Sequence, residues 1–99
     1  MWHKVAKVSD IEEGKSQQIQ VGDQQVALFK TREGFYAIDG FCPHRGGPLG
    51  QGCLENGTVT CPWHAWTFDI KTGECQNAPD TKQKCFPVKV DGDSILIDV

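Results

Sequence analysis

Short apolar segments separated by turn-forming residues run along the whole chain and predict an all-β protein. No window shows the 3.6-residue period of an amphipathic helix. The best helical candidate is a single turn between Ser9, whose side chain would cap it, and Gly14, which would end it. The strands that this pattern predicts span residues 2–8, 19–21, 26–30, 35–38, 58–60, 66–70, 85–90 and 95–99.

Glycine and aspartate mark the expected hairpin connections, because glycine adopts positive φ angles and aspartate tolerates them. The last of these turns, at residues 91–93, lies so close between Val88–Val90 and Ile95–Ile97 that we predict one antiparallel hairpin there. The other expected turns fall at residues 22–23, 32–34 and 71–73.

One long segment departs from the strand pattern. Residues 40–52 contain five glycines and two prolines among 13 positions, a composition too rigid and too rich in positive-φ positions for a strand. Long ordered loops in compact domains are usually functional. We therefore expect a functional site in this stretch.

The 99 residues suffice for one domain, 1–99, whose modest core would gain stability from a metal centre. A formal net charge of −3, with Lys and Arg scattered among 13 acids, argues against nucleic-acid binding. No signal-peptide pattern and no stretch of roughly 20 apolar residues is present, so we expect a cytoplasmic protein without a membrane anchor. Five cysteines, an odd number, then indicate metal binding more than disulfides.

Two short motifs combine cysteine with histidine. The first, C-P-H, runs from Cys42 to His44, and the second, C-P-W-H, runs from Cys61 to His64. Two thiolates and two imidazoles bind either zinc or an iron–sulfur cluster. Structural zinc sites tend to repeat one ligand type within each motif, whereas each motif here is mixed and could reach both irons of a binuclear centre. The spacing therefore favours a cluster, and zinc stays open as an alternative.

The pattern Cys-Pro-His-x-Gly-Gly-x-Leu followed by Cys-Pro-x-His-x-x-x-Phe-Asp resembles the two cluster-binding loops of Rieske proteins, and the resemblance covers most of the chain. It implies one [2Fe–2S] cluster with Cys42 and Cys61 on the inner iron and with His44 and His64 on the outer iron. It also implies the Rieske fold, in which small antiparallel sheets form a sandwich or barrel with a cluster-binding loop subdomain. The resemblance places the cluster-binding loops at about 40–53 and 61–68, and a covering proline loop at about 76–80.

Four positions depart from the high-potential, respiratory branch of that family. This branch has a disulfide between two extra cysteines, where the chain has Gly47 and Trp63. It also has a serine and a tyrosine that donate hydrogen bonds to the cluster, where the chain has Trp66 and Phe68. Such bonds raise the reduction potential, so the resemblance implies a potential near the low end of the roughly −150 to +300 mV Rieske range.

A short, low-potential chain of this kind resembles the ferredoxin components of aromatic-ring dioxygenases and related monooxygenases. The resemblance implies a monomeric electron carrier rather than an enzyme. Its partners would be a flavin-containing reductase and a terminal Rieske non-haem iron oxygenase. Two alternatives stay open, namely the small Rieske-like subunit of an NAD(P)H-dependent nitrite reductase and a zinc-stabilised structural module.

Several chemically notable residues lie outside the four predicted ligands. We expect Cys53, Cys75 and Cys85 to pack as buried thiols. Trp63 and Trp66 flank His64, and we expect them to shield the cluster from water, with a docking surface as the alternative interpretation.

Overall fold

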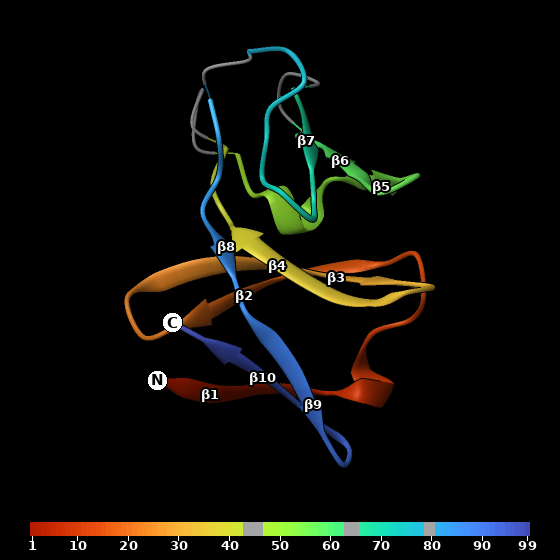
Figure 1. The fold of residues 1–99 in the computed structure, drawn as a ribbon, viewed down its shortest axis with the longest axis vertical. Helices are drawn as coiled ribbons and strands as arrows, with labels where there is room; N and C mark the ends of the chain where they lie inside the picture. Colours follow the sequence, from red (N-terminus) through yellow and green to blue (C-terminus); the bar gives the residue numbers. More distant parts are fainter. Residues whose placement is uncertain (43–46, 63–65, 79–80) are drawn as a thin grey trace.

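The computed structural model describes residues 1–42, 47–62, 66–78 and 81–99, and the strands in these ranges form three small antiparallel sheets (Figure 1). The lower sheet contains, in spatial order, β1 (Trp2–Lys7), β10 (Ser94–Asp98) and β9 (Val88–Asp91). The middle sheet contains β2 (Ser16–Val21), β3 (Gln24–Thr31), β4 (Gly34–Asp39) and β8 (Cys85–Phe86). The upper sheet contains β5 (Cys53–Glu55), β6 (Thr58–Thr60) and β7 (Thr67–Asp69). The predicted all-β class is confirmed.

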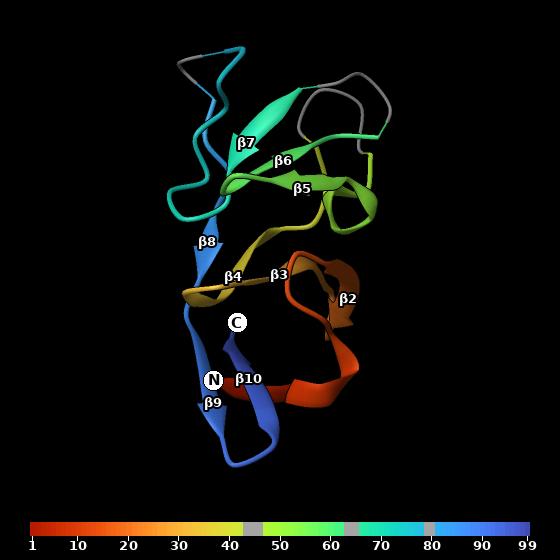
Figure 2. The same ribbon diagram turned by 90° about the vertical axis from the view of Figure 1, so that its right-hand side faces the viewer.

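The three sheets follow one another along the long axis of the molecule, as the two perpendicular views in Figures 1 and 2 show. Both termini lie at the lower sheet, where the amino group of Met1 pairs with the Asp98 carboxylate at 2.5 Å. The upper sheet lies at the opposite end, next to the chain segments that flank the two Cys/His motifs. The fold thus separates a basal part from a smaller part that carries the predicted site.

Strand β3 is the centre of the packing because both of its faces are buried. Successive side chains of a strand point to opposite faces, and four consecutive residues from Val26 to Phe29 are all fully buried. Val26 and Leu28 pack in a basal core with residues of the lower sheet. Ala27 and Phe29 pack in an upper core with residues of β6 and β7. One strand therefore joins the two parts of the molecule.

The predicted hairpin at residues 91–93 is confirmed, with Ile95 opposite Val90 in the ladder of β9 and β10. The single strand predicted over 85–90 is instead two strands, β8 and β9, in different sheets. Pro87 separates them and has no N–H to donate to a ladder. Its carbonyl accepts a hydrogen bond from the amide of Asp98 at 3.0 Å. This proline passes the chain from the middle sheet to the lower one.

The helical turn predicted to begin at Ser9 is displaced. A short 3-10 helix, η1, spans Val8–Asp10, and the Asp10 carboxylate accepts a hydrogen bond from the amide of Lys7 at 2.9 Å. Gly14 follows with a φ of 83° and already donates its amide proton to the carbonyl of Lys30 at 2.8 Å. Pairing with β3 thus replaces any helical continuation beyond residue 10.

The glycine-rich segment contains more regular structure than its composition predicts. A 3-10 helix, η2, spans Leu49–Gln51, and strand β5 follows at once. A Cβ atom on Gly52 would collide with the carbonyl oxygen of Thr60. Glycine at position 52 therefore permits the close approach of the chain to β6, and local sequence pattern missed β5 for this reason.

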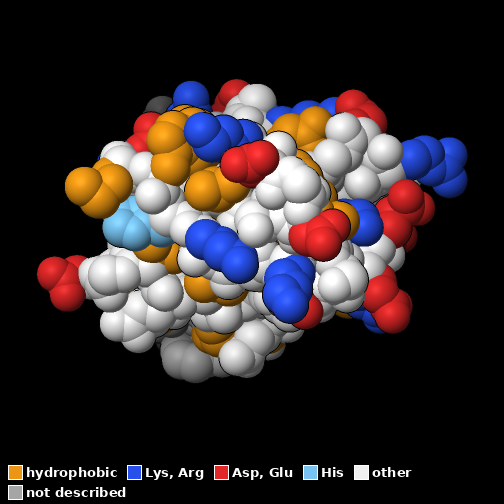
Figure 3. All heavy atoms as spheres, turned by 90° about the horizontal axis from the view of Figure 1, so that it is seen from below, with side chains coloured by type: hydrophobic (Ala, Val, Ile, Leu, Met, Phe, Trp, Pro, Cys, Tyr) orange, Lys and Arg blue, Asp and Glu red, His pale blue; other side chains and the backbone are white. Residues whose placement is uncertain are grey.

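The face seen from below in Figure 3 carries Lys and Arg side chains interspersed with Asp and Glu. On this face the charges of the two signs are mixed and form no field of a single sign. None of the helices within the described ranges has the length and apolar character required to cross a bilayer.

We predict that both faces of β3 contribute to stability. Leu28→Ala and Phe29→Ala should each lower the free energy of unfolding by about 3 kcal/mol, because each leaves a cavity in one of the two cores. In thermal unfolding this corresponds to a fall in melting temperature of roughly 12 to 24 °C. Val90→Ala is the control, since Val90 is 48% exposed, and it should change the stability by less than about 0.5 kcal/mol. Equal losses in all three variants would contradict the two-core description.

Candidate metal centre

Two of the four predicted ligands, Cys42 and Cys61, lie in the described residues and belong to one buried cluster. Cys42 follows β4 and is 1% exposed, and Cys61 follows β6 and is 2% exposed. Both pack in the upper core with Phe68 of β7 and Leu49 of η2. The fold thus brings together two thiols that are 19 positions apart in the chain.

The two cysteine loops are closed by the same backbone interaction. The amide of Cys42 donates a hydrogen bond to the carbonyl of Gly47 at 2.8 Å, and the amide of Cys61 donates one to the carbonyl of Trp66 at 2.8 Å. In each case the bond joins a cysteine to the fifth residue after it. In both loops the backbone amide of the cysteine is thus held by a hydrogen bond, which restrains the position of the attached thiol.

The other two predicted ligands, His44 and His64, lie outside the described residues, as does Trp63. The assignment of His44 and His64 as ligands therefore stays a prediction. The described half fits an iron–sulfur centre, because thiolates are the ligands that such clusters use and burial protects them from solvent. Nothing in the described half conflicts with the two motifs.

A third segment, which contains the described residues 76–78 of the predicted covering loop, packs beside β7 and the upper core. The side-chain oxygen of Asn77 accepts a hydrogen bond from the amide of Thr67 at 2.7 Å, and the carbonyl of Thr67 accepts one from the amide of Gln76 at 2.8 Å. Ala78 packs against the upper core. Residues 79–80, which include the proline of this loop, lie outside the described residues.

Two aromatic residues, Trp66 and Phe68, occupy the positions at which the resemblance to the respiratory branch would place hydroxyl groups. Phe68 is fully buried in the upper core, and Trp66 is half-buried against the same core. A phenyl ring has no hydrogen-bond donor, and an indole has only its N–H. The shielding role expected for Trp66 stays a prediction.

Two glutamines that the sequence analysis did not single out hold the base of the first cysteine loop. The side-chain amide of Gln18 contacts Gly40 and Gly50, and that of Gln83 contacts Asp39 and Phe41. The sequence pattern contains no signal for either residue, because Gln18 alternates with Ile19 along β2 as a polar residue on a solvated face would, and its half-burial beside the loop follows from the tertiary structure.

The three cysteines outside the motifs do not behave alike. Cys75 is buried in the upper core, as predicted. Cys53 and Cys85 are exposed, so the prediction of buried packing is wrong for both. The Cys85 thiol lies 3.6 Å from the carbonyl of Lys71, and partial burial raises the pKa of this thiol above its ordinary value. Among the described residues, Cys75 and Cys85 form no disulfide.

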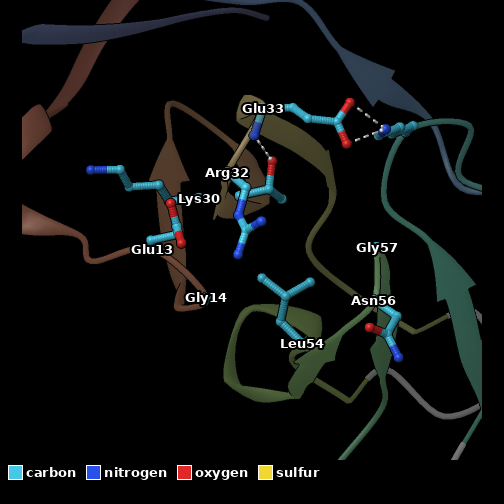
Figure 4. Close-up of a pocket in the computed structure, with 10 residues that line it drawn as sticks. Glu13, Gly14, Lys30, Arg32, Glu33, Leu54, Asn56 and Gly57 are labelled. Carbon is cyan, nitrogen blue, oxygen red and sulfur yellow. Dashed lines mark hydrogen bonds and ion pairs between the residues drawn. The ribbon is translucent and has the colours of Figure 1, made fainter.

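A cavity of about 380 Å³ lies between the β3–β4 turn and the β5–β6 turn (Figure 4). Arg32 and Leu54 extend into it, and Glu33 at its edge forms an ion pair with Lys71 at 2.9 Å. The hydrogen bond that the Lys71 ammonium donates to the Glu33 carboxylate raises the pKa of Lys71 above its ordinary value of 10.5. Neither Cys42 nor Cys61 is among the residues that line this cavity in the described part of the chain. It is thus separate from the predicted cluster site.

Comparison with known proteins assigns a family to this arrangement. The sequence profile of the Rieske [2Fe-2S] domain matches residues 1–90. Apoptosis-inducing factor 3 of Mus musculus is 38% identical over 95 residues, which are 94% of this chain but 16% of that protein. The ferredoxin component of the naphthalene 1,2-dioxygenase system of Pseudomonas putida is 33% identical over 99 residues, which are 99% of this chain and 95% of that one. The chain thus spans nearly all of one relative and about a sixth of the other.

Solved structures show the same fold. The ferredoxin of carbazole 1,9a-dioxygenase from Nocardioides aromaticivorans IC177 matches with a TM-score of 0.91 and 25% identity, covering 98% of this chain and 96% of that one. A candidate NADH-dependent nitrite reductase small subunit from Mycobacterium tuberculosis matches with a TM-score of 0.90 and 21% identity, covering 98% and 93%. The second likeness establishes the fold alone.

We predict that Asn77 anchors the third segment to β7. Asn77→Ala removes the acceptor of the Thr67 amide and should lower the free energy of unfolding by about 1 kcal/mol. Gln76→Ala is the matched control, because the hydrogen bond of Gln76 comes from its backbone amide, which the substitution preserves. Thermal unfolding of both variants measures the difference. A loss in Gln76→Ala as large as in Asn77→Ala would contradict a role for the Asn77 side chain.

Proposed function

The chain belongs to the Rieske [2Fe–2S] domain family and carries a Rieske-type cluster; we propose that Cys42, His44, Cys61 and His64 hold it and that the protein is an electron carrier of an oxygenase system. One observation carries the ligand assignment. Cys42 and Cys61 are buried in a single core, and each begins a loop closed by the same backbone hydrogen bond. Each of these cysteines also begins one of the two Cys/His motifs.

The proposal gives the four side chains two different tasks. Cys42 and Cys61, both buried, bind the inner iron as thiolates, and His44 and His64 bind the outer iron through neutral imidazole nitrogens. When bound, the cluster supplies the exchange of one electron at a time. The protein's own contribution is to exclude water from the thiolates and to place them against the rigid upper core.

The proposed route of the electron runs from a flavin-containing reductase through this chain to a terminal Rieske non-haem iron oxygenase. The relatives that support it are named as the ferredoxin components of naphthalene and carbazole dioxygenases, and the chain covers nearly their whole length. In this proposal residues 1–99 form one monomeric domain in the cytoplasm and perform no substrate chemistry. Carriers of this kind use small, transient interfaces, which suit a protein that alternates between partners.

A low reduction potential is part of the proposal. Hydrogen bonds from hydroxyl groups to the cluster stabilise its reduced, more negative state. Phe68 offers no such donor and Trp66 has no hydroxyl. The potential should therefore fall near the low end of the roughly −150 to +300 mV Rieske range.

The second candidate function is that of a small nitrite reductase subunit. The likeness to the candidate subunit from Mycobacterium tuberculosis supports it at the level of the fold. The presence of all four ligand residues is compatible with both functions. The terminal electron acceptor decides between them, and it would be an oxygenase in the first case and a sirohaem enzyme in the second. The family match weakens the third alternative, a zinc-stabilised module.

We predict that the dithionite-reduced protein gives a rhombic S = 1/2 EPR signal with a low average g value, with iron and labile sulfide present in equal amounts. Cys42→Ser and Cys61→Ser should lose the signal, because each removes a proposed ligand. Cys53→Ser is the matched control and should retain it, since Cys53 is exposed and lies outside both motifs. Stoichiometric zinc and no EPR signal in protein made under iron-replete, anaerobic conditions would contradict the proposal.

We predict that Trp66→Ser raises the reduction potential relative to Trp66→Ala. Both variants lose the same packing against the upper core, but only serine adds a hydroxyl donor. One hydrogen bond to the reduced state corresponds to roughly 20 to 60 mV for a one-electron couple. Protein-film voltammetry measures the difference. Equal potentials would mean that residue 66 does not face a cluster sulfur.

A further inference from the structure

The hydrogen-bond ladder of the middle sheet ends just before Cys42. On the β8 side, the last backbone bond of β4 runs from the amide of Asp39 to the carbonyl of Lys84 at 2.8 Å. On the β3 side, the last one runs from the amide of Gly40 to the carbonyl of Gln25 at 2.8 Å. Beyond these bonds β3 and β8 offer no further backbone partners in the described part of the chain. The remaining ones come from the first cysteine loop itself, where the carbonyl of Gly40 accepts from the amide of Leu49 at 2.8 Å and the amide of Cys42 donates to the carbonyl of Gly47 at 2.8 Å.

On the β8 side, the side chain of Gln83 takes the place of the missing strand. Its Nε2 atom donates to the carbonyl of Asp39 at 3.2 Å and to the carbonyl of Phe41 at 2.5 Å. Gln83 is 6% exposed, and among the described residues it is the only polar or charged one that is buried. Its backbone amide donates to the carbonyl of Gly73 at 2.7 Å, which ties the same residue to the turn after β7.

On the opposite, β3 side, the side chain of Gln18 of β2 provides the corresponding hydrogen bonds. Its Nε2 atom donates to the carbonyl of Gly40 at 2.9 Å, and its Oε1 atom accepts from the amide of Gly50 at 2.8 Å. One side chain therefore joins the two ends of the first cysteine loop. The hydroxyl of Ser16, two positions earlier on β2, donates to the carbonyl of Gly50 at 2.8 Å and reinforces the far end.

The two glycines make this contact sterically possible. A Cβ atom on Gly40 would collide with Nε2 of Gln18, and a Cβ atom on Gly50 would collide with the backbone amide of Gln18. Glycine at both positions therefore lets the loop ends come within hydrogen-bond distance of β2.

Three successive carbonyls thus accept glutamine amides from alternating sides. The side-chain amide of Gln83 donates to the carbonyls of Asp39 and Phe41, and that of Gln18 donates to the carbonyl of Gly40 between them. This alternation is the pattern of an extended strand between two neighbours. We propose that Gln18 and Gln83 are positioning residues that extend the sheet by side-chain amides up to Cys42 and so hold its thiol in place for the cluster.

The role demands a primary amide of this length. The Gln18 position needs one donor and one acceptor together, which a carboxylate cannot supply because it only accepts. An aliphatic side chain leaves the Gly50 amide and a lone pair of the Gly40 carbonyl without their partner. Asparagine keeps the chemistry but is one methylene shorter. This inference rests on the proposed assignment of Cys42 as a ligand.

The test compares Gln18→Met and Gln83→Met with Gln20→Met in the cluster-loaded protein. Gln20 stands on the same face of β2 as Gln18, and within the described ranges its side chain hydrogen-bonds to Gly22 and Gln25 and to neither end of the first cysteine loop. Gln25 also accepts a longer bond of 3.4 Å from Gln18. We expect release of iron to an excess of a ferrous chelator, followed by visible absorbance, to be about ten-fold faster in the two test variants. The EPR lines of their reduced forms should broaden as Cys42 samples more positions, and the Gln20 variant should match the wild type in both measurements.

Three results are decisive. Iron-release rates and EPR line shapes equal to those of the wild type in both test variants would overturn the inference. A lower melting temperature with unchanged release rates and line shapes would also overturn it, because that result marks a purely structural role. A wild-type protein that binds no cluster would contradict the proposed function instead. If Gln83→Met does not fold, Gln83→Asn and the half-buried Gln18→Met provide the same comparison.

Discussion

The burial of both faces of β3 is the constraint on which the rest of the structure depends. Four adjacent apolar residues, Val26 to Phe29, cannot be covered by one neighbouring layer, because their side chains alternate between the two faces of the sheet. The lower sheet covers Val26 and Leu28, and the upper sheet with the cysteine loops covers Ala27 and Phe29. The upper sheet and the cysteine loops are thus part of the folding unit, since their removal would expose one face of β3.

The same arrangement explains how the described ends of the cysteine loops are held in place. Buried carbonyl and amide groups that leave a sheet must find other partners, because an unsatisfied buried polar group costs about 1–3 kcal/mol. In this chain the partners are glutamine side chains at one loop and backbone carbonyls five residues downstream at both loops. Each bond that satisfies the backbone also limits where a cysteine thiol can lie. Stability and site geometry therefore have the same physical origin.

Membership of the Rieske family defines the cofactor but leaves the partner to the individual chain. The same domain corresponds to nearly all of a dioxygenase ferredoxin component and to about a sixth of apoptosis-inducing factor 3. The electron-carrier proposal rests on the first kind of relative. The basal face carries charges of both signs, and the buried thiols of Cys42 and Cys61 belong to the upper core.

The sequence by itself determined the elements whose cause is local. The hairpin around residues 91–93 and the all-β class follow from apolar segments and turn residues that are neighbours in the chain. The four candidate ligands follow from two motifs of three and four residues, and the structure places the cysteine half of them in one core. Tertiary structure alone decided the strand β5, the division of the strand predicted over 85–90, the exposure of Cys53 and the glutamine contacts of the first loop. Those contacts join residues 22 to 44 positions apart. No local pattern reports them, because the partners of a side-chain amide depend on which backbone groups the assembled sheets leave unsatisfied.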